Sequence, residues 1–186
     1  MTRGKGTTVR MTDPGERVVL LADDGEAIGT AAKATVHTAD TPLHLAFSCH
    51  LRDADGRLLV TRRALSKATW PGVWTNSFCG HPAPGEDMPA AVARRALREL
   101  GVTVTDLRIV LPDFRYRAVD ASGVVENEIC PVFSAVTLDE VRPDPDEVAE
   151  FRWVDAADLA VAARTAPWAF SPWLNLQLDQ LAPVGA

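Results

Sequence analysis

Short apolar runs separated by turn signals cover much of the chain between residues 17 and 154. The first are RVVLLAD, LHLAFSCHLR and RLLVTRRA, and the tetrapeptides DDGE and DADG follow the first two. Runs of about four to eight residues bounded by Gly and Asp are typical of β-strands, and DADG between two runs is typical of a hairpin. Strand-like runs return at LRIVLP, FRYRAV, VVENEICPVFSAV and EFRWV. The pattern therefore predicts a fold rich in β-sheet.

One segment changes from a strand period to a helical one. In DMPAAVARRALREL the side chains of Val92, Ala96 and Leu100 recur every four residues and form one apolar column. Asp87 is a candidate N-cap, and Gly101 suits the left-handed residue that ends many helices. The pattern predicts a helix that buries this column.

The rest of the pattern predicts the domain organisation. A final helix is expected over 155–164, and the acidic stretch LDEVRPDPDEVAE (138–150) is expected to be a solvated loop. Residues 1–15 have no apolar period, which predicts a flexible tail before a single domain over 16–186. Strands interleaved with few helices indicate an α/β (α+β) fold, a mixed β-sheet sandwich flanked by helices.

Composition narrows the class of protein. With 186 residues, 47% of them hydrophobic and 24% charged, the chain suits one globular domain. A net charge of −6 argues against a nucleic-acid partner, so any anionic ligand must meet a local cluster of Arg and Lys. An odd number of cysteines argues against a disulfide framework, and no apolar run of about 18 residues predicts a membrane span. We expect a cytoplasmic protein with reduced thiols and no membrane partner.

Histidines and glutamates offer a candidate metal site. HTADTPLH contains His37 and His44, a third histidine is His81, and ENE contains Glu126 and Glu128. Residues two apart in a strand share a face, so both carboxylates point the same way and favour a cation between them. Three imidazoles and two carboxylates suit an octahedral Mn, Mg, Fe or Zn site. The alternative is that each histidine caps or packs and that ENE is a solvated strand edge.

A second set of residues surrounds the predicted helix and resembles the Nudix box, a loop and helix that bind diphosphate through a divalent metal. Its members are Gly80, Glu86, Arg94, Glu99, Gly101 and Val102. Arg95 and Arg98 stand where the box has glutamates. Arg95 and Glu99 are four residues apart, and they form either a surface ion pair or a phosphate-binding cation beside a metal-binding carboxylate.

Basic residues gather close in sequence to the NSFCGHP segment. TRRALSK contains Arg62, Arg63 and Lys67, and Lys33 lies upstream. Such residues are either solvated ends of strands or, in an acidic protein, a cradle for a diphosphate. Within NSFCGHP, Gly80 is expected to allow a tight turn that points Cys79 and His81 to different parts of one site.

Several longer runs are similar to motifs of the type I isopentenyl-diphosphate Δ-isomerases, in that family's order. They are HTADTPLHLAFS, LLVTRRALSKATWPGVWTNSFCGHP, PDFRYRA, GVVENEICPVF and PWAFSPW, and the resemblance extends from about residue 17 to 176. It implies a Nudix-like fold and the conversion of isopentenyl diphosphate to dimethylallyl diphosphate, the allylic starter of isoprenoid biosynthesis. It implies no flavin, and we expect a monomer or weak homodimer.

The resemblance also implies a role for individual residues. Metal ligands for Mn²⁺ or Zn²⁺ fall on His37, His44, His81, Glu126 and Glu128. Proton-handling groups fall on Cys79, Glu128 and Tyr116. Diphosphate ligands fall on Lys33, Arg63, Lys67 and Arg95. Glu99 and the Cys79 carbonyl match ligands of a Mg²⁺ that arrives with the diphosphate. Trp173 is expected to shelter a carbocation with Trp74 as a second wall, while Cys49 and Cys130 are structural.

Two points stay open at the level of sequence. Glu128, aided by Tyr116, is expected to deliver the proton and Cys79 as a thiolate to remove one, but the opposite assignment is equally consistent with the residues. Two other functions compete with the isomerase: a Nudix hydrolase of nucleoside diphosphates, and a non-catalytic domain that binds diphosphates or a protein. The substitutions at Arg95 and Arg98 disfavour the first, and the combined His, Cys and Glu set disfavours the second.

Overall fold

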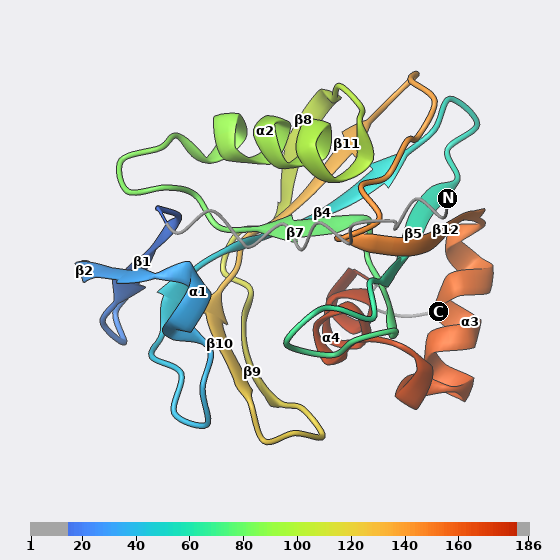
Figure 1. Ribbon diagram of the computed structural model, residues 1–186. Helices are drawn as coiled ribbons and strands as arrows, with labels where there is room; N and C mark the ends of the chain where they lie inside the picture. The colour runs from blue at the N-terminus through green and yellow to red at the C-terminus, as the bar shows by residue number, and fades with distance from the viewer. Residues whose placement is uncertain (1–14, 182–186) are drawn as a thin grey trace, which may run out of the picture.

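A computed structural model describes residues 15–181 of the chain (Figure 1). The strands are β1 (Arg17–Leu21), β2 (Ala27–Ala32), β3 (His44–Leu45), β4 (Phe47–Arg52), β5 (Leu58–Arg63), β6 (Trp74–Thr75), β7 (Phe78–Gly80), β8 (Thr105–Leu111), β9 (Arg115–Val119), β10 (Val125–Ile129), β11 (Val132–Val136) and β12 (Val148–Val154). The helices are α1 (Lys33–Val36), α2 (Met88–Leu100), α3 (Ala156–Thr165), the 3-10 helix η1 (Pro167–Ala169) and α4 (Pro172–Leu181). Apart from residue 15, the predicted tail lies outside the described residues, and the single domain over 16–186 stays a prediction.

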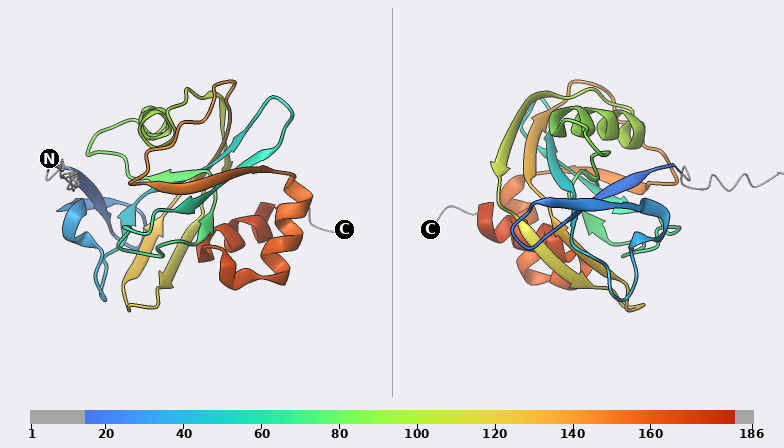
Figure 2. Two further views of the ribbon diagram at one scale, coloured as in Figure 1. Left: turned by 45° about the vertical axis from the view of Figure 1, so that its right-hand side comes forward. Right: turned by 90° about the vertical axis from the view of Figure 1, so that its left-hand side faces the viewer.

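Two mixed sheets organise the strands, which confirms the predicted class of fold. One sheet has the order β2-β1-β3-β10-β9, and the other has the order β12-β5-β4-β11-β8, with β6 and β7 paired to β5 and β4. Helix α2 packs on one face of the second sheet, whereas α3 and α4 cover its other face (Figures 1 and 2). On β5, Leu59 faces the core under α2, while Leu58 and Val60 pack with Leu159 and Leu174 of the other helices.

The runs 43–52 and 124–136 each contribute to both sheets, so each contains two strands where one was expected. The first run changes sheet at Ala46, and the second changes at Cys130 and Pro131. Pro131 has no N–H to donate, which suits the end of a strand better than its interior. The two runs cross together, because β10 pairs parallel with β3 and β11 pairs parallel with β4.

Helix α2 forms where the four-residue period predicts it. Val92, Ala96 and Leu100 are fully buried, as the apolar column requires. Asp87 occupies the N-cap, although its side chain makes no capping hydrogen bond. Gly101 ends the helix with a φ of 68°, a left-handed conformation that glycine adopts without steric cost.

The C-terminal third departs from the expectation in two places. Helix α3 begins after Asp155, whose side chain accepts a hydrogen bond from the Ala157 amide, but it is followed by a further helix, α4, that the sequence reading missed. The acidic stretch is not a uniformly solvated loop, since Val141 and Val148 are buried in the core under α2. Within residues 15–181, none of the helices has the length and apolar content needed to cross a membrane.

Substitution of Gly101 tests the left-handed end of α2. A Cβ there would lie 3.0 Å from the Arg142 carbonyl oxygen, in addition to the cost of a φ of 68°. We expect Gly101→Ala to lower the free energy of unfolding by roughly 1–2 kcal/mol in denaturant titrations. Gly29→Ala is the control, because its Cβ would meet no atom within 4 Å and its φ is not left-handed. Equal stability of the two variants would contradict this account of the helix end.

Candidate active site and metal centre

The point at which the two runs cross between the sheets brings His44, Glu128 and Tyr116 together. Glu128 of β10 lies opposite His44 of β3 on one side and opposite Tyr116 of β9 on the other. Glu126, two residues before Glu128, is also buried, as expected for two side chains on one face of a strand. Strand register therefore places two carboxylates, an imidazole and a phenol on one buried face of the first sheet.

Two further histidines complete the cluster from outside this sheet. His37 follows α1 and His81 follows β7, and ligand atoms of His37, His44, His81 and Glu128 all lie within 4.8 Å of one another. Glu128 Oε1 lies 3.1 Å from His81 Nε2 and 3.4 Å from His44 Nε2. The fold thus assembles four of the five predicted ligands into one group and places the fifth, Glu126, beside His37.

The donor atoms of this cluster have the arrangement that a metal ion requires. His37 Nε2 and Glu126 Oε2 are buried 3.0 Å apart, and neither has a hydrogen-bond partner among the described residues. His44 Nδ1 donates to the Pro42 carbonyl oxygen, 2.9 Å away, which fixes the ring and turns Nε2 toward the other ligand atoms. Unpartnered buried atoms of this kind are costly without a ligand, so the residues fit a divalent metal with N and O ligands.

Charges within the cluster compensate one another. Burial alone would raise the pKa of Glu128, but hydrogen bonds from His44 and His81 hold it well below its usual range. Burial lowers the pKa of His81 to about 4, so this imidazole is neutral and able to act as a ligand. Glu128 is therefore an ionised carboxylate beside a neutral imidazole.

Cys79 and the pair formed by Tyr116 and Glu128 are the groups able to handle protons. The Tyr116 hydroxyl donates to Glu128 Oε2 at 2.9 Å, and burial and the charge of Glu128 raise the pKa of Tyr116 well above its usual value. Cys79 is half-buried on β7, where burial raises the pKa of its thiol to about 11 and a hydrogen bond with Ser48 acts in the opposite direction. In the ligand-free protein Cys79 is a neutral thiol and Tyr116 a neutral phenol.

An aromatic wall adjoins the thiol, but one of its members differs from the expectation. The ring of Trp173 lies 5.7 Å from Tyr116 and 5.4 Å from Trp70, measured between centroids. Trp70 and Cys79 pack against the same buried cluster, whereas Trp74 packs with the core between β5 and helices α3 and α4. Trp70, not Trp74, is therefore the second wall.

A residue with unusual backbone geometry marks this wall. Trp70 has a φ of 42°, a conformation that costs energy for a side chain of this size. The Arg63 guanidinium donates to the carbonyl oxygens of Thr69 and Trp70, and it lies 5.4 Å from the centroid of the Trp173 ring. Arg63 thereby holds the strained loop against the aromatic wall.

Three of the predicted diphosphate ligands lie beside carboxylates. Arg95 donates to Glu99 at 2.8 Å, Lys67 pairs with Glu147, and Lys33 pairs with Glu16 at 2.7 Å. Arg95 and Glu99 are only 3% and 7% exposed, so the surface ion pair considered above is wrong. Arg62 instead pairs with Glu150 at the half-exposed end of β5. This agrees with the alternative that a basic residue here is the solvated end of a strand.

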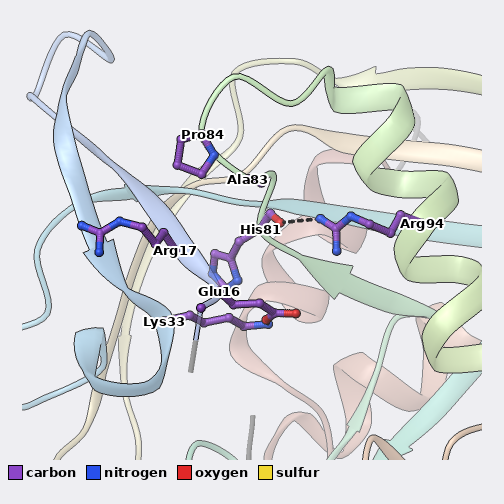
Figure 3. A pocket seen from close by; sticks show the side chains of 8 residues that line it. Glu16, Arg17, Lys33, His81, Ala83, Pro84 and Arg94 are labelled. Carbon is purple, nitrogen blue, oxygen red and sulfur yellow. Dashed lines mark hydrogen bonds and ion pairs between the residues drawn. The ribbon is translucent and has the colours of Figure 1, made fainter. Parts of the chain in front are cut away.

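Two carboxylates beside the predicted diphosphate ligands were not predicted from the sequence. Glu147 contacts both Lys67 and Arg95, although it lies in the stretch expected to be solvated. Glu16 accepts hydrogen bonds from Lys33 and Arg98 and lines a cavity of about 310 Å³ together with Lys33 and His81 (Figure 3). The sequence offers one signal for these two residues, because each glutamate stands directly before an apolar strand.

Gly80 is required for a different reason from the one expected. Its backbone is not left-handed, but an added Cβ would lie 2.7 Å from Arg95 Cγ and 2.9 Å from Phe47 Cζ. The absence of a side chain therefore lets α2 approach β7 closely. This contact brings Arg95 alongside the Cys79 strand.

Comparison with known proteins defines the class. Residues 42–174 match the NUDIX domain family. The DR0079 protein of Deinococcus radiodurans has a similar fold, with a TM-score of 0.69 and 20% identity over 90% of this chain and 99% of that one. The MutT protein of Methanosarcina mazei Go1 aligns with a TM-score of 0.59 and 18% identity over 75% and 93% of the two chains. The chain belongs to the NUDIX domain family and carries a buried cluster of His and Glu side chains.

Relatives with much higher identity identify the family. The isopentenyl-diphosphate Delta-isomerase of Clavibacter sepedonicus is 69% identical over 168 residues, which cover 90% of this chain and 88% of that protein. The protein of the same name from Leifsonia xyli subsp. xyli is 66% identical over 92% and 94% of the two chains. The chain belongs to the isopentenyl-diphosphate Delta-isomerase family.

Removal of a single ligand tests the metal centre. We expect His37→Ala and Glu126→Gln each to lower metal affinity about 10–100-fold, because the remaining ligands lose one donor and its orienting contact. Metal content of the purified variants, measured by mass spectrometry after dialysis against trace metal, reports this loss. Glu150→Gln is the control, since Glu150 pairs with Arg62 outside the cluster. Full metal content in both cluster variants would refute the assignment.

Proposed function

We propose that the chain interconverts isopentenyl diphosphate and dimethylallyl diphosphate, which supplies the allylic starter for isoprenoid biosynthesis. The observation that carries the proposal is a thiol, Cys79, and a buried carboxylate and phenol, Glu128 and Tyr116, around one aromatic wall. The family names of relatives up to 69% identical support it. The reaction adds a proton to the terminal alkene carbon and removes another from the allylic carbon on the other side of the double bond, so it requires a proton donor and an acceptor.

Cys79 and Glu128 are the two groups that exchange protons with the substrate, and Tyr116 delivers a proton to Glu128. A phenol hydrogen-bonded to a carboxylate at 2.9 Å is within reach for such a relay. The ligand-free protein holds Cys79 as a neutral thiol, because burial raises its pKa to about 11. The expected role of Cys79 as a thiolate base therefore requires that the thiol first lose its proton.

Five residues are proposed to hold Mn²⁺ or Zn²⁺, namely His37, His44, His81, Glu126 and Glu128. Glu99 and the Cys79 carbonyl oxygen are proposed to hold a Mg²⁺ that arrives with the diphosphate. Bound cations stabilise negative charge on the carboxylates and on the diphosphate. No flavin enters this proposal.

The diphosphate is bound by Lys33, Lys67, Arg95 and Arg63. In the ligand-free protein, carboxylates already pair with the first three of these cations, so binding must exchange partners. Glu99 would hold the Mg²⁺ of the diphosphate, and Arg95 would then be released to bind the phosphate oxygens. The local charge then stays close to balanced despite the net charge of −6.

The aromatic wall of Trp173, Trp70 and Tyr116 is proposed to shelter the carbocation. A positive charge over a desolvated indole face gains roughly 2 kcal/mol. Trp173 is buried, and its Nε1 donates to Asn76 Oδ1 at 3.0 Å, so its ring is held rigidly next to the thiol. This wall has no role in the rival function, diphosphate hydrolysis.

The residues of the Nudix-like box do not support the rival function, a Nudix hydrolase. Arg95 is buried against Glu99, and Arg98 pairs with Glu16, so the two positions that would add metal-binding acids carry cations. We further propose that the protein acts on a small-molecule substrate and has no nucleic-acid or membrane partner. It is proposed to be a cytoplasmic monomer or weak homodimer.

Substitution of Lys67 tests the diphosphate site. We expect Lys67→Gln to raise KM for isopentenyl diphosphate roughly 10–100-fold with little change in kcat, because it removes one charge-assisted hydrogen bond to the substrate. Arg62→Gln is a matched control, since Arg62 forms a similar ion pair on β5, just before the Lys67 loop and outside the site. Steady-state kinetics of both variants measure the change in KM and kcat. An unchanged KM for Lys67→Gln would remove Lys67 from the diphosphate site.

Turnover in heavy water separates isomerase from hydrolase. Wild-type protein with Mg²⁺ and isopentenyl diphosphate should form dimethylallyl diphosphate that carries solvent deuterium, without release of phosphate. Cys79→Ala should fold and retain metal but lose ~10²–10⁴-fold in rate, as expected for a missing acid or base. Cys79→Ser should be nearly as slow, because a hydroxyl is much less acidic than a thiol. Phosphate release by the wild type, or near-normal turnover by Cys79→Ala, contradicts the proposal.

A further inference from the structure

A chain of buried polar side chains leads from α4 to the Cys79 thiol. Ser48 of β4 lies directly opposite Cys79 of β7 in the strand register, with its Oγ 3.3 Å from Cys79 Sγ. Gln177 of α4 donates to Ser48 Oγ at 2.9 Å, and its Oε1 lies 3.0 Å from His50 Nε2. Ser48 and Gln177 are 0% exposed and His50 is 4% exposed, so water does not compete for these contacts.

The polarity of this chain is set by the groups that it contains. Gln177 contributes its amide nitrogen to Ser48, so the Ser48 oxygen acts as an acceptor there and its single hydrogen remains available. The other neighbours of Ser48 Oγ are two thiols, Cys79 at 3.3 Å and Cys130 at 3.5 Å. The Ser48 hydroxyl is therefore free to donate to a sulfur atom.

Asn76 contacts the thiol with the opposite polarity. Its Nδ2 donates to the carbonyl oxygens of Cys49 and Phe78, at 3.1 and 2.8 Å, which fixes the orientation of the amide. Asn76 Oδ1 then faces Cys79 Sγ at 3.3 Å and can only accept. Cys79 sits between a hydroxyl that is able to donate and an amide oxygen that accepts.

We propose that Ser48 and Gln177 are positioning residues that hold the Cys79 sulfur in its reactive orientation. The inference rests on the proposed function, in which Cys79 exchanges a proton with the substrate. A thiol makes only weak hydrogen bonds, so a half-buried cysteine without fixed partners would occupy more than one rotamer. A displacement of about 1 Å at a reacting group can cost on the order of 10²-fold in rate.

Helix α4 links this chain to the aromatic wall. Gln177 and Trp173 are four residues apart on one face of the helix, and both are buried. Gln177 reaches the thiol through Ser48, whereas Trp173 reaches it through Asn76 Oδ1. The same helix therefore orients the sulfur from both sides, and His50 anchors the far end by its contact with the Gln177 amide.

Kinetics of Ser48→Ala and Gln177→Met test the proposal. We expect Ser48→Ala to lower kcat on the order of ten-fold and Gln177→Met about three-fold, with KM for isopentenyl diphosphate within about two-fold of wild type. Because Gln177 acts through Ser48, the double variant should be no slower than Ser48→Ala alone. The unfolding free energy of each variant is measured in parallel.

Ser77→Ala is the matched control for a lost buried hydroxyl. Ser77 is also 0% exposed, but its hydroxyl accepts from the Leu51 amide and donates to the Leu59 carbonyl oxygen, both at 2.7 Å, without contact to the thiol. We expect kcat within about two-fold of wild type despite a comparable or larger loss of stability. Restoration of most of the activity by Ser48→Thr, which keeps the hydroxyl, would support the role of the oxygen.

The outcomes separate this inference from the proposed function. Near-normal kcat in Ser48→Ala together with an inactive Cys79→Ala overturns the inference alone, as do multiplicative effects in the double variant or a parallel rise in KM. Near-normal turnover by Cys79→Ala overturns both. If Ser48→Ala fails to fold, Gln177→Met decides, because a kcat equal to that of wild type in a folded protein would contradict the proposed coupling.

Discussion

The site depends on two runs of the chain that cross from one sheet to the other side by side. Strands β3 and β10 pair in the first sheet and continue as β4 and β11 in the second, so both crossings are held in register. His44 and Glu128 lie just before the crossing, and Ser48 lies just after it, opposite Cys79 of β7. The His and Glu cluster and a thiol from different sheets thereby become neighbours, and neither sheet alone could hold both.

Burial of charge is the second constraint. Cationic side chains in a partly buried region are costly without a partner, because the desolvation penalty is high. The protein solves this with internal carboxylates, among which Glu147 contacts both Lys67 and Arg95. The residues proposed to bind the diphosphate are therefore already neutralised by carboxylates in the ligand-free protein.

Local patterns in the sequence determined much of the fold and the chemical class of the site. The four-residue period of Val92, Ala96 and Leu100 and the stop at Gly101 specify α2, since these signals act within a few residues. The alternation in ENE placed both carboxylates on one face, as observed. The resemblance of the motifs to one family supplied the grouping of residues that are distant along the chain, which spacing alone could not show.

Only the tertiary structure decided features that depend on contacts between distant segments. From the sequence, Trp74 is expected to be the second wall, whereas the packing of the loop by Arg63 places Trp70 there. Glu147 reads as one acid in a charged stretch, and its burial beside two cations is visible only once β12 pairs with β5. Likewise Gln177 lies 129 residues from Ser48, so no local signal could join them. Burial and hydrogen-bond partners are properties of the assembled fold, whereas helix period and strand alternation are properties of the chain.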